Sequence, residues 1–303
     1  MSKPKTIDGY AQPVTEGCER VLVTLLRNLG PWRETVFLVG GLAPRYLIRA
    51  RPPEVPQHAG TGDVDVVVDI AMLTDMEAYR SLEDNLHVMG FRRAVNAATG
   101  RKQSWRWQAE VDGGTMILEF LADSPERGGG RVQELPTEGK VSAVHIPHAS
   151  MVVDFHETVE ITAELLDGNG RATEAVRFAD IVSFTCLKAF AFDERFERKD
   201  AHDLVYCLEF LEGGLDAAHR AFREAMNTGH RDVIQDALHR LARRFCGADP
   251  TQSYLKDGPV AVARFEDNDA DVAADDDMRN RRILRQRRVA DIVTEFLRPL
   301  LNA

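Results

Sequence analysis

The sequence lacks several features that would assign it to a class at once. Its four cysteines are scattered along 303 residues without a CxxC pair, which indicates reduced, mostly buried thiols rather than a disulfide framework or zinc site. Apolar runs all fall short of the ~20 residues that a membrane span needs. Residues 1–17 lack the apolar core of a secretory signal, so we expect a cytoplasmic protein without a membrane partner. The histidines show no metal-ligand spacing.

Positive charge is also scarce. The 38 lysines and arginines are outnumbered by 48 acidic residues, and the formal net charge of −10 argues against non-specific coating of nucleic acid. The charge is uneven, because residues 265–277 are acidic and residues 278–290 are basic. We expect the acidic stretch 266–277 to be a solvated, partly disordered linker.

The first part of the chain mixes strand and helix patterns. Strands are predicted at 35–41, 63–70, 104–111, 115–123, 152–166 and 172–178. Helices are predicted at 16–29, 43–50 and 75–91, and loops at 51–62 and 124–140. This succession favours an α+β or α/β domain, and we expect the α+β class with a mixed sheet and flanking helices.

The pattern becomes helical from Asp180 onward. Helices are predicted at 179–196, 200–212, 215–227, 231–245 and 280–301, the last rich in arginine. We therefore expect an N-terminal domain over 1–178 and a C-terminal helical domain over 179–303.

Two aspartates stand at the start of the valine-rich strand predicted at 63–70. Because side chains alternate across a strand, Asp63 and Asp65 project to the same face. Carboxylates on one face repel each other unless a cation lies between them, and Mg²⁺ is usually held by one or two carboxylates together with substrate phosphates. Taken alone, the motif favours a strand end whose polar side chains face solvent.

A pair of glycines ends the apolar run before this strand. Gly40 and Gly41 precede Pro44, which suits the first turn of a helix because its missing N–H would be unpaired there. Backbone without a Cβ atom can approach a phosphate, and a helix N-terminus favours anions. The alternative is an ordinary tight turn between a strand and a helix, without a role in binding. The glycine turn and the aspartate motif are each weak signals. Their succession, in which a strand, a Gly-Gly turn and a helix precede a strand with two aspartates, is more specific than either motif alone.

In this order the motifs resemble the nucleotidyltransferase superfamily with the polymerase-β-like fold. The resemblance implies that Asp63 and Asp65 hold two Mg²⁺ ions, with Mn²⁺ as an alternative, that bind the triphosphate of a nucleoside triphosphate. It also implies that Gly40 and Gly41 form the turn that faces the phosphates.

The same resemblance implies a third carboxylate on a later strand. Its counterpart is Glu119, whose neighbours Leu118 and Phe120 would face the other side of the strand, and Asp123 is the alternative. Thr61, just before the aspartates, is a further candidate to donate to a phosphate.

A second set of charged residues lies in the helical part. Lys188 and Arg195 are seven residues apart, nearly two helical turns, so they share one face. Lys188 lies within the apolar "FTCLKAFAF", where two cations need anions such as phosphates or carboxylates. In the following "KDAHDL", Asp200 could cap the next helix, with Asp203 in its first turn, where the helix dipole favours a negative charge.

With the Gly-Gly and aspartate motifs, this set resembles the AbiEii-type abortive-infection toxin family, which includes the MenT toxins of mycobacteria. The resemblance covers residues 36–211 in order. It implies that Lys188 and Arg195 neutralise triphosphate charge, and that Asp200 or Asp203 orients Lys188 or assists the acceptor.

The activity implied is transfer of a nucleoside monophosphate to a hydroxyl, of tRNA or another RNA, by a toxin of a toxin–antitoxin or phage-defence system with a cognate antitoxin. The arginine-rich stretch 279–288 is a candidate RNA-contacting face, or else it pairs with the acidic residues 266–277. Transfer to a small molecule such as an aminoglycoside, or a non-catalytic nucleotide-binding module, are the alternatives.

Overall fold

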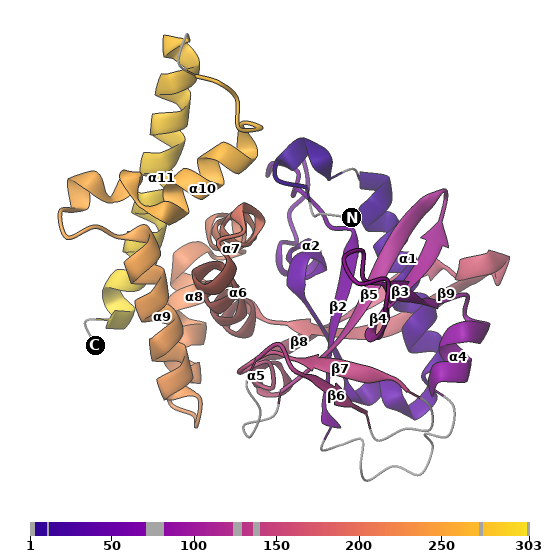
Figure 1. The fold of residues 1–303 in the computed structure, drawn as a ribbon. Coiled ribbons are helices and arrows are strands. Elements are labelled where there is room, and N and C mark those ends of the chain that lie inside the picture. Colours follow the sequence, from indigo (N-terminus) through magenta and orange to yellow (C-terminus); the bar gives the residue numbers. More distant parts are fainter. Residues whose placement is uncertain are drawn as a thin grey trace. The chain divides into compact units, whose positions relative to one another are not determined.

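The computed structural model (Figure 1) describes residues 4–10, 12–70, 82–123, 129–135, 140–272 and 275–301. The chain forms two compact units. The first comprises Ala11–Ala43 and Gly60–Asp180, and the second comprises Ser2–Tyr10, Pro44–Ala59 and Ile181–Ala303. Residues 44–59, which connect the Gly-Gly turn to the aspartate motif, therefore belong to the second unit.

The first unit is built on one mixed sheet, which confirms the expected α+β class. Its strands are β1 (Val36–Val39), β2 (Asp63–Val68), β3 (Arg92–Val95), β4 (Lys102–Val111), β5 (Gly114–Ala122), β6 (Val132–Glu134), β7 (Ser142–His145), β8 (His156–Glu164) and β9 (Arg171–Ala179). The order is β3-β4-β5-β2-β1-β9-β8, and β7 pairs with both β5 and β6. Three pairs are parallel, β2 with β5, β1 with β9 and β5 with β7, and the others are antiparallel.

Two helices, α1 (Gln12–Asn28) and α4 (Leu82–Val88), cover one face of this sheet. The Cys18 Sγ atom on α1 lies 3.7 Å from Met116 Sδ on β5. On α4, the His87 ring packs edge-on against Trp107 of β4, with their centroids 5.4 Å apart. Because side chains alternate across a strand, Leu118, which is fully buried, faces the same helices as Met116. The odd-numbered residues of β5 face away from α1 and α4.

The second unit is helical. Its long helices are α6 (Ile181–Arg195), α7 (Arg198–Phe210), α8 (Gly214–Ala225), α9 (Arg231–Phe245), α10 (Asp257–Glu266) and α11 (Asp276–Leu301). The last helix packs against α7, α8, α9 and α10. Phenylalanines fill the core, with Phe184, Phe192, Phe222, Phe245, Phe265 and Phe296 fully buried. Burying each such side chain stabilises the fold by about 2 kcal/mol.

Each unit also contains short helical elements. They are η1 (Ile7–Gly9), η2 (Gly30–Thr35), η3 (Gly40–Leu42), α2 (Pro44–Leu47), α5 (Met151–Asp154), η4 (Leu166–Gly168) and η5 (Pro250–Leu255). None of the helices in the described ranges is both long and apolar enough to cross a membrane.

Several predicted elements differ from the structure. The strand predicted at 152–166 is wrong at its N-terminal end. Val152 lies buried in the helical turn α5, and strand β8 begins only at His156. The loop predicted at 124–140 contains β6, which its glycine-rich composition concealed. Helix α10 was not predicted, since its Gly-Pro pair resembles a helix break, yet Pro259 lies in the first turn where proline is tolerated. Of the helix predicted at 75–91, residues 75–81 lie outside the described residues.

Candidate active site

The aspartate pair lies on the face of the sheet opposite α1 and α4. Along β2, Asp63 and Asp65 are partly exposed, whereas Val64 and Val66 are fully buried. This alternation follows from the pleat of the strand, and it turns both carboxylates to one side. Both residues make polar contacts within the protein.

The Gly-Gly turn lies directly against the second aspartate. Strand β1 ends at Val39, which is paired with Asp65 on β2, and the chain then enters η3 at Gly40. Gly40 has φ +71°, and a Cβ atom placed there would lie 2.0 Å from Asp65 Oδ2. Only glycine fits both the left-handed backbone and this close approach. The two motifs, 25 positions apart in the sequence, therefore meet in one place.

Glu119 shares the row of Asp65 across the sheet. Strands β2 and β5 are parallel with Asp65 directly paired to Glu119, so the two side chains lie on one face of neighbouring strands. Leu118 and Phe120, fully buried, lie on the other face. In turn, Arg106 on β4 is paired with Glu119, and its Nε atom lies 2.9 Å from Glu119 Oε1.

Asp123, the alternative third carboxylate, lies beyond the end of β5 and has other partners. Its Oδ2 atom accepts hydrogen bonds from the Ser150 backbone N–H at 3.2 Å and from the Ser150 hydroxyl at 2.7 Å. Its Oδ1 atom lies 3.2 Å from His145 Nε2. The pairing register brings Glu119, and not Asp123, beside Asp65.

Thr61 is buried at the start of β2 and supports Asp63. Its hydroxyl accepts a hydrogen bond from the Asp63 N–H at 3.1 Å, and its own N–H donates to the Thr15 hydroxyl on α1 at 3.1 Å. A threonine hydroxyl that binds the backbone two residues on fixes the local turn. This geometry supports a role in positioning Asp63.

The residues on this face match a hard divalent cation. Asp63, Asp65 and Glu119 offer only carboxylate oxygens, which are the ligands that Mg²⁺ and Mn²⁺ prefer. The Asp65 carboxylate occupies the space that a Cβ atom at residue 40 would take, so Gly40 allows the carboxylate to lie against the turn. The donor set therefore fits Mg²⁺.

In the second unit, the two predicted cations meet the two predicted aspartates. Lys188 Nζ lies 2.9 Å from Asp200 Oδ1 and 2.7 Å from Asp203 Oδ2, and all three side chains are buried. Arg195, whose side chain is 53% exposed, binds Asp200 with two hydrogen bonds of 2.7 and 2.9 Å. Lys199 contacts both oxygens of Asp203 at 2.7 and 2.8 Å. Both aspartates thus orient Lys188.

The predicted cap at Asp200 is wrong. Helix α7 begins at Arg198 after Glu197, so Asp200 is its third residue and Asp203 lies one turn further on. The Asp200 carboxylate is committed to Lys188 and Arg195 instead of to the backbone.

The electrostatics of this cluster favour charged aspartates. Burial alone would raise the pKa of Asp200, but Lys188 and Arg195 lower it to about 2. Asp203 is likewise held well below its usual pKa, by Lys188 and Lys199, despite its burial. Burial works against a charged Lys188, yet the two aspartates raise its pKa above the usual value. For Lys199, burial prevails over Asp203 and lowers the pKa.

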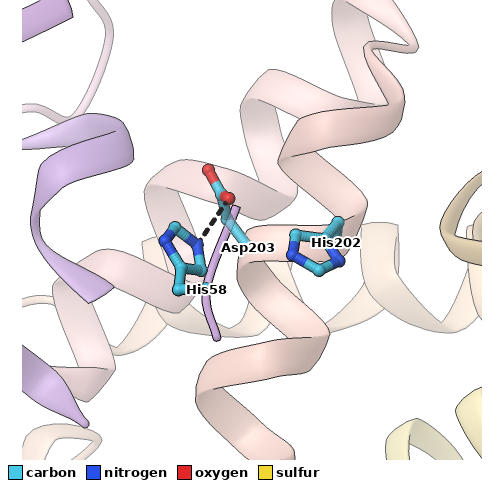
Figure 2. Close-up of side chains that lie close together, drawn as sticks. All are labelled: His58, His202 and Asp203. Carbon is cyan, nitrogen blue, oxygen red and sulfur yellow. Dashed lines mark hydrogen bonds and ion pairs between the residues drawn. The ribbon is translucent and has the colours of Figure 1, made fainter. Parts of the chain in front are cut away.

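Two histidines, which the sequence patterns do not predict, complete the cluster. His58 Nε2 donates to Asp203 Oδ1 at 2.9 Å, and burial lowers the pKa of His58 to about 4 despite this aspartate. Figure 2 shows the His58 ring next to His202, with ring centroids 5.7 Å apart. His202 Nδ1 donates to Glu266 Oε1 at 3.0 Å. His58 and Asp203 are 145 positions apart in the sequence, so no local pattern connects them.

His58, His202 and Asp203 each offer one ligand atom within 4.8 Å of the others. Both oxygens of Asp203, however, already contact lysine ammonium groups, Lys188 on one and Lys199 on both. A divalent cation there would meet two positive charges at close range, which is strongly unfavourable in a buried setting. This cluster is therefore a poor match for a divalent cation, whereas Asp63, Asp65 and Glu119 offer the oxygen ligands that Mg²⁺ prefers.

The arginine-rich helix is largely engaged within the second unit. Arg282 pairs with Asp267, Arg285 with Glu266 and Glu209, Arg288 with Glu209, and Arg279 with Asp276. Arg287 stacks on the Tyr254 ring at 5.2 Å. This arrangement favours the interpretation in which the basic stretch pairs with nearby acidic residues. Within the acidic stretch 266–277, residues 273–274 lie outside the described residues.

A mixed sheet with carboxylates beside a glycine turn has the chemistry of a metal–phosphate site. A family model described as nucleotidyltransferase matches residues 20–241. The matched range covers well over half of the 303 residues, and it includes the Gly-Gly turn, the aspartate pair and the Lys188 cluster. The chain therefore belongs to this nucleotidyltransferase family, whose members transfer nucleotidyl groups from nucleoside triphosphates. A search of the curated proteins found no match.

Proposed function

We propose that this protein is a Mg²⁺-dependent nucleotidyltransferase in which Asp63, Asp65 and Glu119 hold the metal. The observation that carries the proposal is the position of Gly40 against Asp65, with Glu119 paired to Asp65 on the next strand. Carboxylates and an open backbone turn are what a metal-bound triphosphate requires from a protein.

In the proposed reaction, an acceptor hydroxyl oxygen forms a bond to the α-phosphorus of the triphosphate. The bond between that phosphorus and the bridging oxygen breaks, pyrophosphate leaves, and the hydroxyl proton is released. Bound Mg²⁺ would supply charge stabilisation at the attacking and leaving oxygens. The Gly40-Gly41 turn would approach the phosphates, and Thr61 would hold Asp63 in place.

The charged residues of the second unit differ in their exposure and in what they bind within that unit. Arg195 presents a half-exposed guanidinium, which suits contact with a phosphate. Lys188 is only 7% exposed and is bound to Asp200 and Asp203. We propose that Lys188 holds the two aspartates in position, and that Asp200 in turn orients the Arg195 guanidinium.

RNA, and tRNA in particular, is the acceptor we favour, in a toxin of a toxin–antitoxin or phage-defence system. This choice rests on the resemblance to the AbiEii-type family. The terminal arginine helix gives it little support, because most of those arginines are paired with acidic residues of the same unit.

Acceptor screening with α-³²P-labelled nucleoside triphosphates and Mg²⁺ tests the proposal. We expect label in the RNA fraction and none with Asp65→Ala. Label found only on an aminoglycoside would show that the acceptor is a small molecule and not RNA. Equal labelling by Asp65→Ala would contradict the assigned site, and Mg²⁺-independent nucleotide binding without any transfer would indicate a non-catalytic module.

A further inference from the structure

Four paired positions form one row across the sheet of the first unit. Arg106 on β4 is paired with Glu119 on β5, Glu119 with Asp65 on β2, and Asp65 with Val39 at the end of β1. Directly paired residues lie on the same face of neighbouring strands. The row therefore places a guanidinium, two carboxylates and the Gly40 turn side by side.

Within this row, Arg106 and a metal compete for the same carboxylate. Arg106 Nε lies 2.9 Å from Glu119 Oε1, and the two side chains are only 27% and 15% exposed. A partly buried ion pair of this kind is more persistent than a surface pair, because water screens it less. A divalent ion that uses Glu119 as a ligand must either displace the guanidinium or share the carboxylate with it.

A triphosphate would provide the alternative partner for Arg106. Guanidinium groups bind phosphate oxygens in the same two-pronged manner as carboxylates. If the triphosphate lies along this face with its metal, Arg106 can leave Glu119 for a phosphate while Glu119 turns to the metal. Arg106 and Glu119 would therefore each have a partner of opposite charge both before and after the exchange.

We propose that Arg106 is a positioning residue that couples metal binding to nucleotide binding through Glu119. It holds the third carboxylate while the nucleotide is absent and releases it when a triphosphate takes the guanidinium. This inference rests on the proposed function, since it needs a metal–triphosphate complex on the Asp63–Asp65 face.

Two binding measurements on the full chain test the coupling. Mn²⁺ binding without nucleotide is followed by electron paramagnetic resonance of the free ion. Binding of a non-hydrolysable α,β-methylene nucleoside triphosphate at saturating Mn²⁺ is followed by calorimetry. The variants are Arg106→Gln and Glu119→Gln. Arg92→Gln is the control, because Arg92 pairs with Glu110 at 2.8 Å on β3 and β4 of the same sheet, in a more exposed position.

For Arg106→Gln we expect changes of opposite sign, with Mn²⁺ bound about tenfold more tightly and the triphosphate analogue about tenfold more weakly. Glu119→Gln should weaken Mn²⁺ binding, and Arg92→Gln should match the wild type. A merely structural role for Arg106 would weaken both ligands together. That result, or no change in either affinity, would overturn the proposal.

Failure of the coupling and failure of the proposed function give different results. If Asp65→Asn abolishes Mn²⁺ binding while Arg106→Gln changes nothing, the metal site stands and the role of Arg106 falls. If Asp65→Asn binds Mn²⁺ as the wild type does, the metal site itself is wrong, and the proposal for Arg106 falls with it. Circular dichroism melts of each variant identify any that fail to fold.

Discussion

Gly40 and Asp65 lie so close that a single added carbon at residue 40 would overlap the Asp65 carboxylate, at 2.0 Å from Oδ2. The contact joins the end of β1 to the side chain that projects from β2, and it depends on the left-handed backbone of Gly40, with φ +71°. In the sequence, this glycine turn looks like the ordinary end of a strand. In the structure, it forms part of the surroundings of the aspartate pair.

Gly40→Ala should disable the site by displacing Asp65. A shift of about 1 Å in a catalytic group commonly costs about 100-fold in rate. The matched control is Gly100→Ala, whose φ of +67° is similar but whose new Cβ would meet nothing within 4 Å. Both variants should lose about 1 kcal/mol of stability from the backbone, and only Gly40→Ala should lose nucleotidyl transfer. Equal activity of the two variants would show that the close approach is unimportant.

Thr61→Val should destabilise the first unit through the backbone of Asp63. The substitution leaves the Asp63 N–H without its hydroxyl acceptor, at an expected cost of about 1–2 kcal/mol, whereas Thr61→Ser keeps the hydroxyl. Urea unfolding monitored by tryptophan fluorescence is suitable, because Trp32, Trp105 and Trp107 all belong to the first unit. If Thr61→Val instead raises only the Michaelis constant for the nucleotide, with stability unchanged, the hydroxyl serves the phosphate.

The aspartate motif and the glycine turn were predictable because their signals are local. Alternation along a strand places Asp63 and Asp65 on one face whatever the rest of the fold does. The choice between Glu119 and Asp123 depended on the register of β5 against β2, which no local pattern encodes. His58 and Arg106 were missed for the same reason, since each meets its partner only through tertiary structure.

The helical half shows a different limit. Its helices were predictable from apolar periodicity, and the shared face of Lys188 and Arg195 followed from their spacing. That spacing does not distinguish phosphates from carboxylates as the anions that they meet. In the structure, α7 supplies the carboxylates of Asp200 and Asp203.

Lys188→Met should strongly destabilise the second unit. The substitution removes a buried cation that contacts Asp200 and Asp203, and breaking a buried pair typically costs about 3–5 kcal/mol. Arg279→Gln is the control, because its pair with Asp276 is exposed and is worth at most about 1 kcal/mol. Urea unfolding followed by circular dichroism at the helix band measures both. A loss below 1 kcal/mol for Lys188→Met would contradict the assigned role of the cluster.

Stability should fall as the pH drops from 7 to 5 because of His58. Its pKa is about 4 in the folded protein and about 6.5 in the unfolded chain, so the unfolded state takes up more protons within this window. Each pH unit between these values costs up to about 1.4 kcal/mol. The His58→Gln variant should show a flatter profile, whereas His239→Gln, exposed on α9, should follow the wild type. A wild-type profile that is flat between pH 7 and 5 would mean that folding does not change the pKa of His58, and it would contradict this prediction.

The location of the bound metal tests the central claim most directly. Crystals grown with Mn²⁺ and a non-hydrolysable nucleoside triphosphate allow the ion to be located by its anomalous scattering. We predict a peak about 2.1 Å from carboxylate oxygens of Asp63 and Asp65, with the triphosphate next to Gly40. A peak at His58, His202 and Asp203, with none at the β2 aspartates, would contradict the account.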